Sequence, residues 1–368
     1  MSGKYAPKIS ALQLALLVMS SRIAVMTVFL PVIWAKGDPK NAWIAAILAG
    51  TGGVFITWIA TVLAEKHPDH SFIQIIQKLL GKWLGRVLSF IFLWFFLHIA
   101  SITTRQFADI LETALMPETP IPVFIIYITI AVIFSVNRGL EAIAKVAAIA
   151  TPFSIVSLLF ISVLNKQYFE INALLPVLED GWSGVIYSSI IPLAWFGEVV
   201  IILMVHPYVR DKHLVKPYCL LSVVVSTILL VIMAIIVVAV FGADEASQLT
   251  LPLFAYVRLI EVADFFERIE AILVAVWISL LFSKICIYLY VGVIGVGQWL
   301  NLTVTRPLIL PMAASPIIYA YVSFESIAEM KQYLTPEHFG YYALVLETAI
   351  PLLLLLLSYL HPRGRTSS

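Results

Sequence analysis

Residues 184–207, GVIYSSIIPLAWFGEVVIILMVHP, form an apolar run long enough to cross a bilayer, which takes about 20 helical residues. The only acidic residue in this run is Glu198, near its centre. A charge at that depth costs about 2.5–3.5 kcal/mol on insertion scales, so a membrane protein keeps one only where it pairs, lines water or binds something. Pro192 and Gly197 weaken the helix just before Glu198. The run therefore predicts an interrupted helix and a polar site at mid-depth.

The composition of the whole chain is that of a membrane protein. Of the 368 residues, 61% are hydrophobic and 12% are charged, and the mean hydropathy of +0.99 is too high for a soluble globular domain. We therefore predict an all-α integral membrane protein, with residues 1–368 in a single polytopic membrane domain. About ten transmembrane helices are expected, at residues 10–34, 41–64, 87–115, 121–136, 142–164, 184–206, 216–241, 270–297, 305–323 and 339–360.

The distribution of Lys and Arg predicts the orientation in the membrane. Most of these residues lie in the two termini and in one set of connections, and loops rich in them stay in the cytoplasm. Both termini are therefore expected in the cytoplasm, which agrees with an even number of spans. The first span leads to another span and not to a cleavage site, so it is expected to be retained.

Several functions receive no support from the sequence. The net charge is +1 and no basic tail is present, so nucleic-acid binding is not expected. Cys219 and Cys286 both fall in apolar spans, where small buried side chains are common. We find no catalytic constellation, no metal-ligand spacing and no cofactor motif, so we expect no enzyme, metal or cofactor.

Four ionisable side chains lie in the middle of predicted spans: Arg22, Glu198, Lys284 and Glu347. Ten spans divide into five plus five, which suggests an inverted repeat of about residues 10–164 and 184–360. The first and sixth spans then correspond, and both are predicted to be interrupted, the first at residues 19–24. Paired interruptions indicate a transporter-type site. The predicted ligand-binding residues are Ser20, Ser21, Arg22, Ala24, Trp195, Phe196, Gly197 and Glu198.

Each of these residues has more than one interpretation. Arg22 can clasp a carboxylate with two hydrogen bonds, or it can form a buried ion pair with Glu198 or Glu347. Glu198 can receive an amino group, or it can be the partner of Lys284. Lys284 and Glu347 lie in spans expected to be unbroken and are interpreted as supporting charges. Trp195 and Phe196 are either walls of the site or ordinary packing.

The third span carries a polar stripe. His98, Thr104, Arg105 and Asp109 lie at helical spacing and are predicted to line an outer vestibule. Arg105 and Asp109 are also placed to pair on one helix face, in which case they would neutralise each other.

Two connections look structured. Residues 70–86 place apolar side chains opposite Lys78 and Lys82, which predicts a cytoplasmic amphipathic helix. Residues 253–270 mix charged and apolar side chains and are predicted to form an outer capping helix.

Several short segments along the chain form a pattern by their order and spacing. They are Ser21-Arg22-Ile23 followed by Leu30-Pro31, Leu80-Gly81-Lys82-Trp83-Leu84-Gly85, Thr104-Arg105, residues 172–178 (NALLPVL), Phe196-Gly197-Glu198, Glu267-Arg268-Ile269-Glu270 and Phe282-Ser283-Lys284. With these segments the chain resembles a known family, the B subunits of spore germination receptors (the GerAB type), within the amino acid, polyamine and organocation transporter superfamily. Many relatives have glycine in the first interruption, where this chain has Ala24 and Met26.

The resemblance implies a LeuT-like fold, with five plus five helices and interrupted helices 1 and 6. It implies a sensor in the inner membrane of a spore, which binds a small germinant such as an amino acid and signals through A and C subunits. Two other hypotheses stay open. The chain can be a secondary amino acid transporter that uses the same fold, or a membrane scaffold whose central charges only lock helices together.

Overall fold

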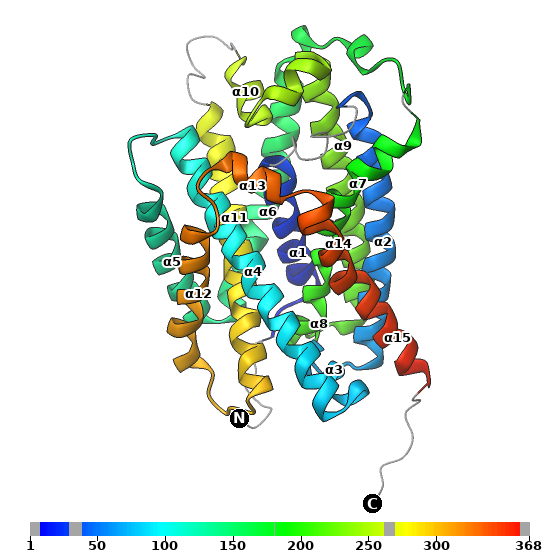
Figure 1. Ribbon diagram of the computed structural model, residues 1–368, viewed down its shortest axis with the longest axis vertical. Coiled ribbons are helices and arrows are strands. Elements are labelled where there is room, and N and C mark those ends of the chain that lie inside the picture. Colours follow the sequence, from blue (N-terminus) through cyan, green and yellow to red (C-terminus); the bar gives the residue numbers. More distant parts are fainter. Residues whose placement is uncertain (1–7, 29–38, 180, 261–268, 361–368) are drawn as a thin grey trace, which may run out of the picture.

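Figure 1 shows the chain as a computed structural model that describes residues 8–28, 39–179, 181–260 and 269–360. Long helices stand side by side in one bundle. Among the described residues, nine helices are long and apolar enough to cross a membrane. A bent pair, Arg306–Val322 and Ile327–Tyr333, meets at 105° and makes a tenth span if it is counted as one. The prediction of an all-α membrane protein with about ten spans is confirmed.

The bounds of the long helices follow the predicted spans closely. The first five spans are α1 (Ala11–Val28), α2 (Ala42–Lys66), α4 (Lys82–Ala114), α5 (Ile121–Arg138) and α6 (Leu140–Leu164). The others are α7 (Trp182–Gly197) with η5 (Glu198–Ile201) and α8 (Ile202–Val205), α9 (Val215–Gln248), α11 (Ile269–Trp299), α12 (Ile309–Val322) and α14 (Tyr341–Leu344) with α15 (Ile350–Leu360). Shorter helices are α3 (Phe72–Leu80), α10 (Pro252–Arg258) and α13 (Ile327–Tyr333).

Burial separates the central helices from those at the periphery. The most apolar windows of α1 and of residues 182–208 are 83% and 89% buried, whereas those of α5 and α6 are 39% buried. α1 packs against α9, α11 and α6, and it lies inside the bundle in Figure 1. Large apolar side chains on α5, such as Ile126 and Phe134, point outward. A bilayer suits such an outer surface, and the helical backbone satisfies its own polar groups.

The first span differs from its prediction. α1 is α-helical from Ala11 to Val28, so the interruption predicted at residues 19–24 is wrong. The sequence there contains neither proline nor glycine, and Ser20 Oγ donates to the Leu17 carbonyl across 2.7 Å, which keeps its hydroxyl within the helix. The part of the predicted span beyond Val28 lies outside the described residues.

The sixth span is interrupted, but later than predicted. α7 continues past Pro192 and ends at Gly197. The chain then forms the 3₁₀ turn η5 and resumes as α8, so the change of helix type places Glu198 at the first position of the turn.

The predicted amphipathic helix at residues 70–86 is shorter. α3 buries Phe72, Ile75 and Ile76 and ends at Leu80, because Gly81 has a φ of +76° that other residues rarely adopt. The residues from Lys82 onward begin α4, and Trp83 is 88% exposed and does not join the buried face of α3.

The outer capping helix predicted at residues 253–270 is described only in part. α10 covers Pro252–Arg258, and residues 261–268 lie outside the described residues. Tyr256 fixes α10 over the end of α6, because its hydroxyl donates to the Ser162 carbonyl (3.0 Å) and its carbonyl accepts from Asn165 Nδ2 (2.6 Å).

The tenth span is not the unbroken helix that was predicted. It contains two π-helical segments, Pro336–Gly340 and Val345–Ala349, on either side of α14. Glu347 lies in the second. π-helical turns inside longer helices are frequent at functional sites.

Candidate functional site

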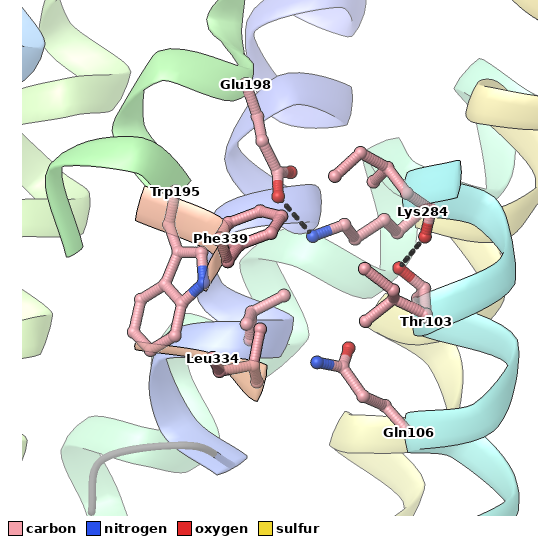
Figure 2. A pocket seen from close by; sticks show the side chains of 10 residues that line it. Thr103, Gln106, Trp195, Glu198, Lys284, Leu334 and Phe339 are labelled. Carbon is pink, nitrogen blue, oxygen red and sulfur yellow. Dashed lines mark hydrogen bonds and ion pairs between the residues drawn. The ribbon is translucent and has the colours of Figure 1, made fainter. Parts of the chain in front are cut away.

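A narrow cavity lies at the centre of the bundle, beside the first residue of η5 (Figure 2). Its volume of about 10 Å³ is roughly the room for one water molecule. An amino acid fits only after surrounding side chains move. The lining residues come from α1, α4, α7, η5, α11 and the chain around α13, and they are Val25, Ile99, Ile102, Thr103, Gln106, Trp195, Glu198, Lys284, Leu334 and Phe339.

Glu198 and Lys284 form a buried ion pair at this cavity. Lys284 Nζ donates to Glu198 Oε1 across 2.6 Å, and the side chains are 3% and 2% exposed for Lys284 and Glu198, respectively. Glu198 Oε2 accepts from Ser21 Oγ (3.0 Å) and from the Tyr288 hydroxyl (3.2 Å). The carboxylate is therefore both neutralised and hydrogen-bonded, as a buried charge must be. Of the two partners predicted for Glu198, this conformation has Lys284.

Arg22 is buried on the α9 side of α1. Its Nη2 donates to Ser222 Oγ (2.7 Å) and its Nε to the Val18 carbonyl (3.3 Å), while its guanidinium lies 5.8 Å from the centre of the Phe196 ring. Nη1 has no hydrogen-bond partner among the described residues. Arg22 does not line the cavity and forms no ion pair among the described residues, so the buried ion pair with Glu198 or Glu347 is not formed in this conformation. Its contact with a solute carboxylate stays a prediction.

Glu347 is fully buried, and neither of its carboxylate oxygens has a hydrogen-bond partner among the described residues. Its side chain lies against Gly197. A Cβ added to Gly197 would collide with Glu347 Oε2 and lie 3.0 Å from Glu347 Cβ. The absence of a side chain at position 197 therefore makes room for Glu347. This explains why the residue just before the 3₁₀ turn is a glycine.

The other predicted ligand-binding residues fall into two groups. Trp195 lines the cavity together with Glu198, and Figure 2 shows its indole ring near the ion pair. Ser20 and Ala24 are buried in α1 and do not line the cavity. Phe196 packs closely against α2, where a Cβ on Gly53 would lie 2.7 Å from Phe196 Cβ.

The predicted outer vestibule is a packed polar layer in this conformation. His98, Thr104, Arg105 and Asp109 are at most 4% exposed. Arg105 Nε pairs with Asp109 Oδ1 (2.9 Å), which is the alternative considered for these two residues. Arg105 Nη1 also donates to the carbonyl oxygens of Ala320 and Phe324, where α12 ends.

The remaining two members of that layer, Thr104 and His98, are held by hydrogen bonds. Thr104 Oγ1 donates to the Ala100 carbonyl within its own helix (2.8 Å). His98 Nε2 lies 2.8 Å from the Tyr333 hydroxyl, which lies 3.0 Å from the Tyr342 hydroxyl.

Several residues at the site were not predicted from the sequence to bind ligand, although Thr103 belongs to the polar stripe of the third span. Tyr288 lies one helical turn after Lys284, and Thr103 and Gln106 are on the cavity side of α4. Gln106 Oε1 is buried without a partner among the described residues. Among the residues outside that stripe, only Tyr288 had a sequence signal, because its spacing of four from Lys284 places both on one helix face. Leu334 and Phe339 had no such signal, because the bend after α12 is what brings their segment back to the cavity.

Metal binding has no visible site in the part of the chain that the structure describes. No three His, Cys, Asp or Glu side chains come together there in a way that holds a metal ion. Cys219 and Cys286 are both free and buried.

Comparisons with known proteins identify relatives along most of the chain. A family model described as "Spore germination protein" matches residues 8–326. Spore germination protein YndE of Bacillus subtilis (strain 168) is 26% identical over 360 residues, covering 97% of this chain and 98% of that protein. Spore germination protein A2 of the same organism is 27% identical over 315 residues, covering 84% and 86%.

Two solved structures have a fold similar to that of this chain. The crystal structure of MhsT in complex with L-phenylalanine has a TM-score of 0.64 at 15% identity and covers 97% of this chain and 99% of that chain. The substrate-bound, outward-open structure of a Na⁺-coupled sialic acid symporter has a TM-score of 0.67 at 11% identity, covering 98% and 91%. The chain therefore has the LeuT fold, and the predicted fold class is confirmed.

Proposed function

The chain belongs to the spore germination protein family, and we propose that it is the germinant-sensing subunit of a spore germination receptor, binding a small solute such as an amino acid. Its membership and its fold make it a receptor subunit or a transporter-like membrane protein rather than an enzyme. The names of its relatives support a role in germination, and the transporters of similar fold were solved with small solutes bound.

The observation that carries the proposal is the Glu198–Lys284 ion pair at the wall of the central cavity. A zwitterionic solute carries one charge of each sign, so it can insert between the two side chains. Its amino group would replace Lys284 on Glu198, and its carboxylate would pair with Lys284. Both buried charges then stay compensated, which limits the cost of opening the pair.

Trp195 and Phe339 are the side chains that must move to admit the solute. Both line the cavity, from α7 and from the π-helical segment before α14, respectively. In this proposal the apolar part of the solute lies between their rings, and movement of either ring passes the signal to the helix that carries it.

The proposal extends to partners and location. The chain is a multi-pass membrane protein, and we place it in the inner membrane of the spore with A and C subunits as signalling partners. Both termini are assigned to the cytoplasmic side. The Ile9 amide donates to the Tyr208 carbonyl (3.1 Å), so the start of α1 and the end of the sixth span share one end of the bundle. The distribution of Lys and Arg is what assigns that end to the cytoplasm. The two repeats are assigned to residues 10–164 and 184–360.

Solute binding is tested by thermal unfolding of the purified full-length chain in lipid nanodiscs. The probe is an equimolar mixture of L-amino acids. A ligand that binds only the folded state stabilises it, by about 2.7 kcal/mol at a hundred times its Kd. We expect a rise in Tm for the native chain and for the control variant Glu245→Gln, which changes an exposed carboxylate.

Glu198→Gln is expected to lose that rise in Tm. An equal rise in Glu198→Gln would show that the solute binds elsewhere, and no rise in the native chain would overturn the amino acid proposal. A variant that fails to accumulate would support the scaffold alternative, because removing one charge leaves its partner uncompensated.

The alternative function is secondary amino acid transport, which the similarity to two transporters favours. The chain reconstituted alone in liposomes distinguishes the two. A transporter accumulates labelled amino acids without partners, whereas a receptor subunit binds them and responds only with its A and C subunits present.

A further inference from the structure

Glu347 differs from the other three central charges in making no side-chain hydrogen bond to the described residues. Glu198, Lys284 and Arg22 each make at least one hydrogen bond to a side chain, while both Glu347 oxygens are buried without a partner among the described residues. An ionised carboxylate without a donor is very costly in an apolar interior. It requires a proton or a positive charge within reach.

Lys284 is the cation available to Glu347. It attracts Glu347 electrostatically, whereas Glu198 repels it. Arg22 interacts with Glu198 and is fixed to Ser222 on the α9 side of α1. The Lys284 ammonium group is therefore the counter-charge for two carboxylates. In this conformation it pairs with Glu198, with 2.6 Å between Nζ and Oε1.

Lys284 is the one cation among the described residues that interacts with Glu347. The π-helical segment Val345–Ala349 packs against α2, α7, η5, α14 and α15. Apart from Glu198 and Lys284, the titratable groups that interact with Glu347 are the hydroxyls of Tyr288 and Tyr342. Neither carries a positive charge.

We propose that Glu347 is a reversible proton-binding site, and that its proton decides which carboxylate Lys284 neutralises. With a proton on one Glu347 oxygen, that side chain is neutral and Lys284 stays on Glu198. When the proton leaves to water, Glu347 carries a full negative charge and Lys284 turns toward it. Glu198 then keeps only the hydroxyl donors of Ser21 and Tyr288 and is free to accept an amino group.

A proton fits this site better than a metal ion. A metal needs several converging ligands, and in the described part of the chain no three acidic, His or Cys side chains come together. A proton needs one oxygen. The close approach of Gly197 leaves the Glu347 side chain little space for a hydrated ion.

In this arrangement, binding of the solute and binding of the proton affect each other. This consequence rests on the proposed function. A solute whose amino group takes Lys284's place on Glu198 leaves the three N–H donors of Lys284 for the solute carboxylate and for Glu347 together, and so favours loss of the proton. Bound solute therefore lowers the affinity of Glu347 for its proton by some factor. By thermodynamic reciprocity, loss of the proton raises the affinity for the solute by that same factor.

The proton site is tested without any solute, by infrared spectroscopy of the native chain in nanodiscs. A protonated, buried carboxyl group gives a carbonyl band that shifts in D₂O. We expect this band at neutral pH in the native chain and in Glu245→Gln, its loss in Glu347→Gln, and its disappearance from the native chain at alkaline pH. No such band in the native chain, or an unchanged band in Glu347→Gln, would overturn the proposal.

Sharing of Lys284 makes opposite predictions for two further variants. Glu198→Gln frees Lys284 for Glu347, so the neutral-pH band should weaken. Lys284→Met removes the cation, so the band should persist to higher pH than in the native chain. Equal bands in both variants would refute the sharing. Because solute is absent throughout, a failure of the amino acid proposal would leave these results unaffected.

Discussion

Lys284 on α11 and Glu198 at the first position of η5 are joined across 2.6 Å in the centre of the bundle, and both side chains are almost fully buried. The pair ties a continuous helix to the point where the sixth span changes from α-helix to 3₁₀ turn. Stability and the proposed binding site therefore depend on the same contact.

The two ends of this pair should differ in their effect on stability. Breaking a buried pair typically costs about 3–5 kcal/mol. We expect that loss for Lys284→Met, which leaves Glu198 without its cation, and a smaller loss for Glu198→Gln, because Glu347 can take over Lys284. The double variant should be more stable than the sum of the single effects predicts. Thermal unfolding of all four chains gives the coupling energy, and strict additivity would contradict an interaction.

Gly197 should not tolerate a side chain. A Cβ there collides with the Glu347 carboxylate, so Gly197→Ala must displace Glu347 or η5. Overpacking of this kind typically costs about 1–3 kcal/mol. The control is Gly184→Ala on the same helix, where nothing lies within 4 Å of the added Cβ. We expect Gly197→Ala to have a lower Tm than the native chain and Gly184→Ala to have the same Tm as the native chain. Equal Tm values would show that the close approach of Gly197 and Glu347 has no energetic consequence.

Arg22 should matter for the packing of α1 more than for solute affinity. Its hydrogen bonds go to Ser222 and to the Val18 carbonyl, away from the cavity. We expect Arg22→Gln to change Tm but to alter the Kd for the solute by less than about tenfold. A tenfold change in Kd corresponds to about 1.4 kcal/mol of binding free energy. Glu198→Gln should lose more affinity than that. Loss of binding in Arg22→Gln at native Tm would restore the role predicted for it from the sequence.

Arg105 should hold the bend between α12 and α13. Its guanidinium donates to the Ala320 and Phe324 carbonyls and pairs with Asp109. Arg105→Lys keeps the charge but loses the forked donors. We expect amide hydrogen exchange at residues 320–327 to accelerate by about tenfold, which corresponds to a local loss of about 1.4 kcal/mol. The exposed control Arg138→Lys should leave that exchange unchanged, and unchanged exchange in both variants would disprove the role of Arg105.

Asp69 should give a small acid-dependent contribution outside the membrane. Lys212 Nζ donates to Asp69 Oδ1 (2.9 Å) and lowers the pKa of that carboxyl. A carboxyl with a lowered folded-state pKa adds stability above its unfolded pKa, and this is lost as the pH falls through the folded value. Asp69→Asn should therefore have a slightly lower Tm than the native chain at neutral pH and the same Tm in acid. High salt should reduce the difference, because Asp69 is exposed. A difference that grows in acid would contradict this sign.

The sequence predicted the helices well and the interruptions less well. Spans were located because about 20 apolar residues are needed to cross a bilayer wherever they occur. The interruption near Gly197 had a local signal in Pro192 and Gly197, although only the structure places the change at Glu198. Around Ser20 the polar residues suggested a break that is not there: the Ser20 hydroxyl bonds within the helix, while Ser21 and Arg22 bond to Glu198 and Ser222 on neighbouring elements.

Sequence alone determined that this chain crosses a membrane repeatedly and carries charges at mid-depth, because the hydrophobic effect and the cost of buried charge depend on residue type and run length. It did not determine which charges meet. Lys284 pairs with Glu198, Arg22 contacts Ser222, and Glu347 has no hydrogen-bond partner among the residues that the structure describes. Those choices depend on how helices far apart in the chain are rotated and packed against one another, a relation that no single helix encodes and that only the tertiary structure decides.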